Sequence, residues 1–323
     1  MKLISENLHI ISPQTKEAIV SRDAARIKNL LTRQAQTKPD WIDLNIGPAR
    51  KNFEGTMKWL TDISMSVSDI PLSFDSTNAH EIRAGLETFA TLQANTGRVQ
   101  SPLHQNTQKC IINSTSADPE RLEIMTDLAA EFGTYLIALT LNNEIGIPKF
   151  ADKRLELAFE IIEKCGEKDI ENEKIIFDPL ILPVCVDQSQ ASEALTTITM
   201  IKESFEPQTL TTIGLSNVSN GVPNLLRPLI NRVFFILAAG CGLDTAIVDS
   251  FDDELLRINK VIETLKPEKD YDNLILRLLE MQQNFGDIAD IEYDKTSREE
   301  VKIYKTAEIL LNKKVYSNSY LEI

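Results

Sequence analysis

Short runs of apolar residues alternate with longer amphipathic stretches along most of this chain. The runs have the length of buried strands, and the stretches between them have helical spacing. This alternation is typical of βα units, in which crossover helices join parallel strands. We expect eight strands, at residues 7–11, 41–45, 71–75, 109–113, 134–140, 174–178, 210–215 and 244–248. The helices between them are expected near 21–36, 53–68, 78–92, 118–132, 151–168, 190–205 and 224–239.

Eight strands with crossover helices predict an α/β fold of the closed (β/α)8 barrel type, a TIM barrel. An open doubly wound sheet is the alternative, but it usually brings a glycine-rich dinucleotide loop. Neither G-x-G-x-x-G nor G-x-x-x-x-G-K-[ST] occurs here. The length of 323 residues is typical of one barrel with an insertion.

The stretch after the last predicted strand has a different composition. Residues 252–300 hold 14 acidic and 7 basic side chains, a net charge of −7 and half of the chain's −14. An apolar stripe predicts helices near 253–265, 270–284 and 297–312. We therefore expect a barrel domain at 1–252 and C-terminal helices at 253–323 packed on it, with an acidic insertion at about 256–304. Two interpretations of this insertion stay open, a solvated helical hairpin or a docking surface for a partner.

Composition excludes several classes of protein. Lys and Arg total 34 against 48 Asp and Glu, which argues against a nucleic-acid binder. No run of 18 apolar residues occurs and MKLISENLHIIS lacks the apolar stretch of a signal peptide, so we expect a cytoplasmic protein that does not enter membranes. The isolated cysteines predict reduced thiols and no intrinsic metal; they are Cys110, Cys165, Cys185 and Cys241.

Several apolar runs end in a carboxylate or a carboxamide. These polar residues are Asp43 and Asn45 in WIDLNIG, Asp75 in PLSFDST, Asn113 in KCIINST, Asp178 in KIIFDPL and Asn217 in TTIGLSN. In a barrel, side chains at the carboxyl ends of different strands converge on one pocket. A carboxylate accepts two parallel N–H groups of an aminopyrimidine edge, and a carboxamide offers both a donor and an acceptor. A single polar strand end is more often a cap or loop anchor, so the convergence is what predicts a site for a flat, nitrogen-rich ring.

Longer segments carry a resemblance to a known family. They are DLNIGPAR, FDSTNAHEIRAGLE, IINSTSADPERLE, LIALTLNNEIGIP, FDPLILP and TIGLSNVSNG with RPLINR. Together they resemble the pterin-binding methyltransferases related to dihydropteroate synthase, and most of all the methyltetrahydrofolate:corrinoid/iron–sulfur protein methyltransferases. The resemblance covers about residues 3–252 and resumes in TAEILLNKKVYSNSY, whereas the segment at 256–304 departs from it.

The resemblance implies roles for particular residues. Asp75, Asn113 and Asp178 match the positions that hold the pterin ring, and Asn217 matches the catalytic asparagine near N5. Arg227 stands where an arginine lies near the pterin, Asn45 is a further substrate-binding position, and Asn220 stands where the family has a glutamine. The implied substrate is methyltetrahydrofolate, and the implied partner is a corrinoid/iron–sulfur protein whose cobalamin-type corrinoid accepts the methyl group. A homodimer is expected from the resemblance alone.

The chemistry of that reaction suits a carboxamide. In that reaction the methyl group is displaced from N5, a tertiary amine nitrogen and a poor leaving group. A proton or a hydrogen bond at N5 must therefore help the carbon–nitrogen bond to break. Asn217 can act as donor or acceptor there without carrying a full charge. His9, His80 and His104 are not placed for this work. The chain lacks the cobalt-ligating D-x-H-x-x-G motif and any cysteine cluster, so the cobalt must arrive on another protein that caps the barrel.

Three alternatives stay open. Dihydropteroate synthase must bind a pyrophosphate, and the last strand here runs into the acidic DTAIVDSFDDE. A sister methyltransferase serving another corrinoid protein, in methylamine, betaine or aryl-ether demethylation, would have the same pterin half-site. A non-catalytic subunit would have lost the pterin residues, which are present.

Overall fold

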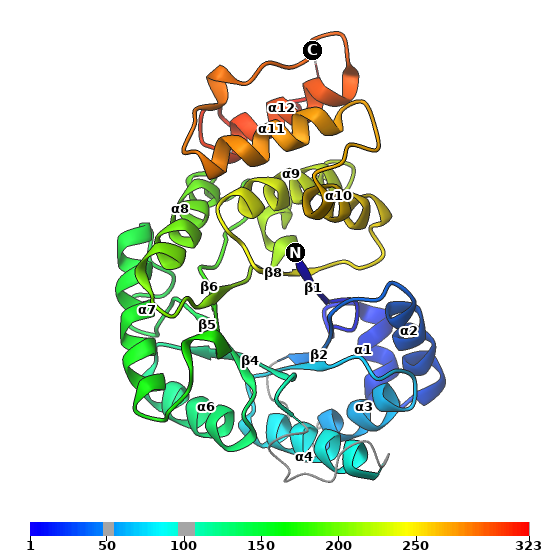
Figure 1. Cartoon of the computed structure of the whole chain (residues 1–323). Helices are drawn as coiled ribbons and strands as arrows, with labels where there is room; N and C mark the ends of the chain where they lie inside the picture. Colours follow the sequence, from blue (N-terminus) through cyan, green and yellow to red (C-terminus); the bar gives the residue numbers. More distant parts are fainter. Residues whose placement is uncertain (48–54, 96–106, 323) are drawn as a thin grey trace.

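The computed structural model describes residues 1–47, 55–95 and 107–322. Eight parallel strands lie in the order β7-β6-β5-β4-β3-β2-β1-β8. Ile247 of β8 donates a backbone hydrogen bond to Ile213 after β7 at 2.9 Å, which brings the two edges together. The result is a nearly closed barrel, confirming the predicted fold class (Figure 1). The strands are β1 Lys2–Ser5, β2 Trp41–Gly47, β3 Leu72–Ser76, β4 Ile111–Ser116, β5 Tyr135–Leu139, β6 Ile175–Asp178, β7 Leu210–Thr211 and β8 Thr245–Val248.

The helices wrap the outside of this barrel. They are α1 Pro13–Val20, α2 Ala24–Gln36, α3 Thr56–Met65, α4 Ala79–Asn95, α6 Pro119–Phe132, α7 Ala151–Gly166, α8 Ser189–Ser204 and α9 Arg227–Gly240. Some of these helices end at the residues that the sequence marks as helix ends. For example, Gly133 ends α6 with φ 64°, a left-handed conformation that glycine adopts without strain.

The first strand was placed wrongly from the sequence. It is Lys2–Ser5 and not 7–11, because the alternating run LHII folds into the loop that follows. The Leu3 N–H donates to the Asp40 carboxylate at 2.8 Å, a contact between distant positions that no local pattern reveals. The helix predicted at 21–36 is α2, which starts at Ala24 because Arg22 has φ 54° and Asp23 caps the helix by accepting from the Arg26 N–H. The sequence analysis did not predict α1, which precedes it.

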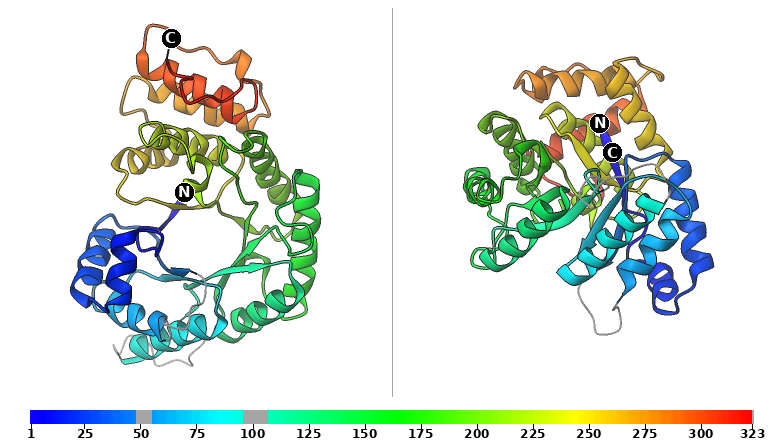
Figure 2. Two further views of the ribbon diagram at one scale, coloured as in Figure 1. Left: turned by 180° about the vertical axis from the view of Figure 1, so that it is seen from behind. Right: turned by 60° about the horizontal axis from the view of Figure 1, so that its bottom comes forward.

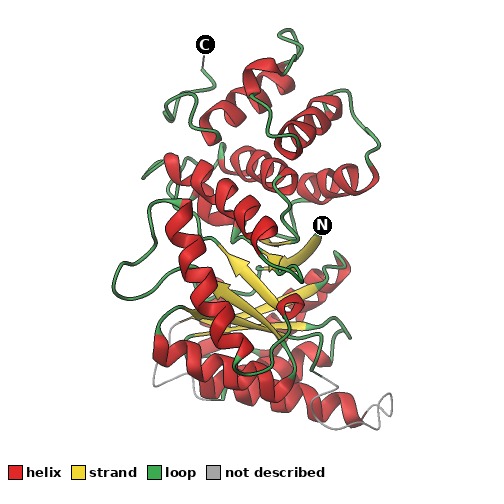
Figure 3. Cartoon of the chain, turned by 60° about the vertical axis from the view of Figure 1, so that its left-hand side comes forward, coloured by secondary structure: helices red, strands yellow, loops and turns green. Residues whose placement is uncertain are grey.

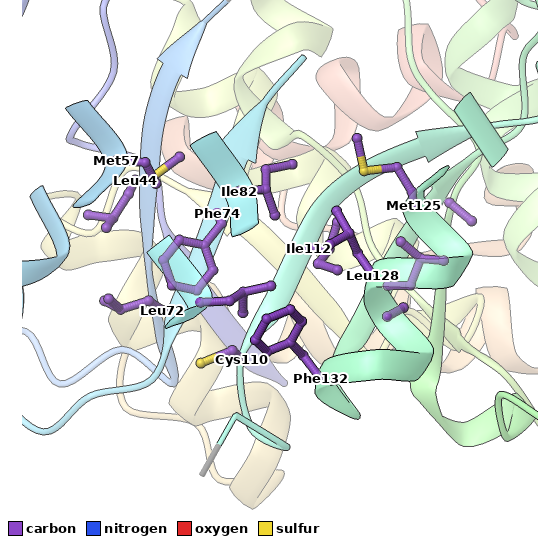
Figure 4. Packing of buried hydrophobic residues seen from close by; sticks show 14 of the residues in the cluster. Leu44, Met57, Leu72, Phe74, Ile82, Cys110, Ile112, Met125, Leu128 and Phe132 are labelled. Atoms are coloured by element: carbon purple, nitrogen blue, oxygen red, sulfur yellow. The ribbon is translucent and has the colours of Figure 1, made fainter. Parts of the chain in front are cut away.

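The inside and outside of the sheet are packed differently. One apolar cluster fills the barrel interior toward the amino ends of the strands, with Ile4, Trp41, Ile111, Ile137 and Ile176 in mutual contact. The outward faces of β2, β3 and β4 pack against α3, α4 and α6, where side chains such as Leu44, Phe74, Ile82, Ile112 and Phe132 interdigitate (Figure 4). Both clusters hold the strands firmly, so the polar strand ends sit on a rigid frame.

Three further helices follow β8 and confirm the helices predicted there, α10 Asp253–Thr264, α11 Asp272–Gln283 and α12 Arg298–Leu310. They stack outside α9 as an additional layer (Figures 2 and 3). Leu274, Ile275 and Leu278 of α11 are fully buried there. The division into two domains at residue 252 stays a prediction. None of the described helices is both long and apolar enough to cross a membrane.

Candidate functional site

Three polar residues lie side by side across neighbouring strands. Asn45 on β2 pairs with Asp75 on β3, and Asp75 pairs with Asn113 on β4. Paired residues of a parallel sheet project to the same face. Their side chains therefore lie together inside the barrel near the carboxyl ends of the strands, an end we call the mouth. The sequence predicted this convergence.

Asn45 is hydrogen-bonded on both ends of its carboxamide. Its Nδ2 donates to the Asp75 carboxylate, and its Oδ1 accepts from the Gly47 N–H at 3.0 Å. Gly47 itself has φ 63°, and a Cβ there would lie 2.3 Å from the Ile10 side chain. The turn after β2 thus requires glycine, and it fixes Asn45 as a support for Asp75.

Asp43 lies one residue pair deeper in the barrel and organises the same network. It accepts from the Ser73 hydroxyl at 2.6 Å and from Asn113 Nδ2 at 3.1 Å. Burial raises the pKa of Asp43 to about 6, against the opposing effect of these two hydrogen bonds. With Nδ2 turned to Asp43, the carbonyl oxygen of Asn113 is the atom that can accept from a ligand.

Asp75 is a half-buried carboxylate with opposing influences on its charge. Burial and the nearby Asp43 raise the pKa of Asp75 well above its usual range, while the Arg121 charge and the Asn45 hydrogen bond lower it. Arg121 also donates to the carbonyls of Ser76 at 3.2 Å and Thr77 at 3.1 Å. It therefore holds the chain just after Asp75. Sequence reasoning missed Arg121, although it lies in the quoted segment IINSTSADPERLE.

Asp178 ends β6 and is also buried. It accepts from the Leu180 N–H at 2.7 Å and from the Gly214 N–H, and burial raises the pKa of Asp178 to about 6. The fully buried Arg154 donates to the Leu180 carbonyl at 3.2 Å and to the Pro148 carbonyl at 2.9 Å. Arg154 thereby holds the loop whose N–H reaches Asp178.

Asn217 lies in a 3-10 turn, Leu215–Ser219, that follows β7. Its side chain is exposed, and its Nδ2 lies 2.8 Å from where a Cβ on Gly214 would be. Gly214 also donates its N–H to Asp178. The glycine therefore makes room for Asn217 and places it next to Asp178.

The other two predicted residues flank that turn. Arg227 is the first residue of α9, and its Nε donates to the Ser219 hydroxyl at 3.3 Å. The Asn220 side chain is exposed, while its carbonyl accepts from the Cys185 thiol at 3.1 Å. The structure thus brings Arg227 to the turn that carries Asn217. The substrate contacts of Arg227 and Asn220 stay predictions.

The remaining candidates are quickly placed. His9 lies in the loop after β1, where burial lowers its pKa, and His80 is exposed on α4. His104 lies outside the described residues. Within the described ranges, no three His, Cys, Asp or Glu side chains are grouped to hold a metal ion. Glu6, which the sequence analysis overlooked, lies at the mouth beside the Asn217 turn.

Comparison with known proteins shows which proteins this barrel resembles. Residues 99–249, a little under half of the chain, match the family described as pterin binding enzyme. A methylcorrinoid:tetrahydrofolate methyltransferase of Eubacterium limosum is 26% identical over 258 residues, which cover 79% of this chain and 88% of that protein. Methionine synthase of Mycobacterium leprae is 28% identical over 257 residues. The matched region covers 77% of this chain but only 20% of the synthase.

Solved structures agree on the fold. A Yersinia pestis dihydropteroate synthase with a pterine–sulfa conjugate has a TM-score of 0.50 at 16% identity, covering 81% of this chain and 94% of the other. A second, with a sulfonamide drug complex, has a TM-score of 0.50 at 14% identity and covers 82% and 94%. At these identities the likeness shows the fold alone. The reaction has to be inferred from the residues of the site.

Proposed function

We propose that this protein is a pterin-binding methyltransferase that moves a methyl group between N5 of a reduced folate and the cobalt of a corrinoid on a partner protein. One observation carries the proposal. Asp75, Asn113 and Asp178 converge at the barrel mouth beside the turn that bears Asn217. The similarity to a methylcorrinoid:tetrahydrofolate methyltransferase supports it.

The two carboxylates at the mouth favour a ligand rich in N–H groups. Burial raises the pKa of both Asp75 and Asp178, so their charged forms lack part of the stabilisation that water would give. The amino and ring N–H groups of a pterin supply it in a fork that matches a carboxylate. Asn113 adds a carbonyl acceptor in the same layer. The site is thus electrostatically incomplete until such a ring binds.

Asn217 is the group proposed to act on the reacting nitrogen. Breaking the N5–methyl bond leaves electron density on N5, and a proton or a donor there stabilises it. Only an interaction that strengthens in the transition state accelerates the step. The Asn217 carboxamide is exposed at the mouth and anchored by Gly214, so it can turn toward N5 without rebuilding the turn.

The methyl acceptor must cover the mouth. Loops that follow four strands present exposed apolar side chains, namely Ile11 at 84%, Ile145 at 54%, Val186 at 72% and Leu225 at 95%. Such residues around an opening favour a protein partner over open solvent. A corrinoid/iron–sulfur protein is the partner we propose. A corrinoid protein of another methyl-transfer system is the alternative.

Dihydropteroate synthesis fits this mouth less well. That reaction releases pyrophosphate, which needs positive charge, whereas the end of β8 carries Asp249, Asp252 and Asp253. Arg232 nearby is already paired with Asp252 at 2.5 Å. A released pyrophosphate would meet repulsion there.

Absorbance spectroscopy tests the proposal. Methyltetrahydrofolate mixed with Co(I) cobalamin and enzyme should give methylcobalamin, and methylcobalamin with tetrahydrofolate should react in reverse. Asp75→Ala is the control for the site, and the corrinoid/iron–sulfur protein replaces cobalamin in a second series to test the partner. A protein that forms no methylcobalamin but condenses a pterin pyrophosphate with an arylamine would overturn the proposal.

A further inference from the structure

Glu6 is a carboxylate at the mouth that neither the sequence analysis nor the proposed reaction uses. It directly follows β1, and its N–H donates to the Val248 carbonyl at the end of β8 at 2.9 Å. Glu6 is therefore fixed at the seam where the first and last strands of the barrel meet. Its side chain is partly buried and is directed toward Ser216, in the turn after β7.

The side chain of Glu6 binds the turn that carries Asn217. The Ser216 hydroxyl donates a hydrogen bond to Glu6 Oε1, joining positions 210 residues apart in the sequence. Ser216 directly precedes Asn217 in the Leu215–Ser219 turn. The opposite end of this turn is held by Arg227 through Ser219 at 3.3 Å. The turn is thus clamped on both sides of Asn217.

The charge on Glu6 depends on groups from four elements. Burial is the largest cause that raises the pKa of Glu6, to about 7, and the charges of Asp249 after β8 and Asp43 on β2 add to it. The Ser216 hydrogen bond and the charge of Arg227 on α9 lower it. Asp249 is held by Asn7 at 2.5 Å and so stays close. Glu6 consequently gains or loses its charge near neutral pH.

We propose that Glu6 is a positioning residue for methyl transfer, which holds the Asn217 turn through Ser216 and in its charged form favours a proton on N5. The inference rests on the proposed function. An ionised carboxylate accepts from Ser216 more strongly than a neutral one. Its negative charge also stabilises a neighbouring cation, and a protonated N5 is the better leaving group.

A pH series on matched variants tests this role. Glu6→Gln keeps the size and an acceptor oxygen but cannot ionise, and Glu300→Gln is the control, a buried carboxylate on α12 outside the mouth. Single-turnover rates are measured with saturating methyltetrahydrofolate and Co(I) cobalamin. The ratio of wild-type to Glu6→Gln rate should be near one below about pH 6 and rise to about tenfold above about pH 8. Glu300→Gln should match the wild type throughout.

Ser216 provides the second test. Ser216→Ala should lower the single-turnover rate on the order of 10- to 100-fold with little change in folate affinity, and adding Glu6→Ala should cause little further loss. A wild-type to Glu6→Gln ratio that does not change with pH, in an active enzyme, would overturn the inference alone. Independent, multiplying losses from Ser216→Ala and Glu6→Ala would do the same. A wild type that transfers no methyl group would instead overturn the proposed function, and this inference with it.

Discussion

Asn45 on β2 donates a hydrogen bond from its carboxamide to the Asp75 carboxylate on β3. The other end of that carboxamide is held by the Gly47 N–H, so the orientation of Asn45 is set by the backbone. The sequence analysis assigned both residues to substrate binding. In the structure the two residues form one chain of contacts, in which Asn45 supports Asp75 and Asp75 lies on the inner face of the barrel.

The first prediction follows from this difference. Asp75→Ala should weaken pterin binding on the order of 10²- to 10⁴-fold, because two hydrogen bonds to a charged acceptor are lost, each contributing about 1.5–3 kcal/mol. Asn45→Ala should cost roughly tenfold, since Asp75 remains but loses its support. Fluorescence titration with folate measures both. Asp62→Ala, an exposed carboxylate on α3, is the control. Near-wild-type affinity in Asp75→Ala would show that the ring binds elsewhere.

The second prediction concerns the pH dependence of binding. Burial raises the pKa of Asp178 to about 6, and that of Asp75 is raised as well. The ligand's N–H groups require ionised carboxylates, so affinity should fall as the pH drops below about 6, by about tenfold per pH unit for each proton. Titration calorimetry in two buffers should show proton release on binding at about pH 6. Affinity that improves toward acid would contradict this electrostatic account.

The third prediction compares the loss of the Asn217 carboxamide with its displacement. Asn217→Ala should lower kcat/KM on the order of 10²–10³, with a smaller effect on affinity. Gly214→Ala keeps the carboxamide but puts a Cβ 2.8 Å from its Nδ2, so it should give a similar loss of rate by displacement. Gly166→Ala, with open space at its Cβ position, is the matched control.

Rapid-mixing experiments measure the single-turnover rate of methyl transfer that tests this third prediction. The wild-type rate of the forward reaction should also rise as the pH drops through the mildly acidic range at saturating substrate, because protonation of N5 helps the methyl group leave. Unchanged single-turnover transfer in Asn217→Ala would remove Asn217 from the chemistry. A forward rate that climbs steadily with pH would indicate a general base and a different reaction.

The fourth prediction concerns stability. Burial raises the pKa of Asp43 from 3.8 to about 6, so the folded state prefers the neutral acid. Its contribution to stability is present below the unfolded pKa and is lost as the pH rises through about 6. Asp43→Asn should therefore raise the melting temperature at about pH 8 and have little effect near pH 4. Asp62→Asn serves as the exposed control. An equal change at both pH values would contradict the sign of this linkage.

The fifth prediction decides between the two interpretations of the acidic segment. Arg257 pairs with Glu254 at 2.8 Å and with Asp272 at 2.6 Å, and the apolar side of α11 is buried. These ion pairs and the buried apolar side hold α10 and α11 together, so deleting 256–304 should destabilise the barrel rather than spare it.

Charge reversal tests docking without that damage. Glu280→Lys combined with Glu292→Lys changes two exposed acids and leaves the buried layer intact. If the acidic segment is only structural, turnover with both free cobalamin and the corrinoid protein should be unchanged. Slower turnover with the protein alone, relieved by salt, would identify a docking surface instead.

The barrel was predictable because its signals are local. Strand-length apolar runs and helix starts such as Asp118-Pro119 follow from spacing and capping. The strand at the amino terminus was not predictable, since Leu3 is held in place by Asp40 and the run around Leu8 and Ile10 has the stronger strand pattern.

The convergence of polar side chains was predictable where they lie near the carboxyl ends of clear strands. Asp75 and Asn113 could be placed side by side because each follows a distinct apolar run. Asp43, Arg121 and Glu6 act through contacts between distant segments, and misplacing β1 removed Glu6 from view. The acid network of the mouth therefore emerges only when β1, β2 and β8 are brought together.

The central claim is that the methyl group moves between folate nitrogen and corrinoid cobalt. Carbon-13 NMR of a single turnover, with methyltetrahydrofolate labelled on the methyl carbon and Co(I) cobalamin as acceptor, tests it most directly. The account predicts that the N-methyl resonance disappears and a cobalt-bound methyl resonance replaces it, with the wild type much faster than Asn217→Ala. A label that stays on the folate nitrogen, with active wild-type protein in excess, would contradict the account.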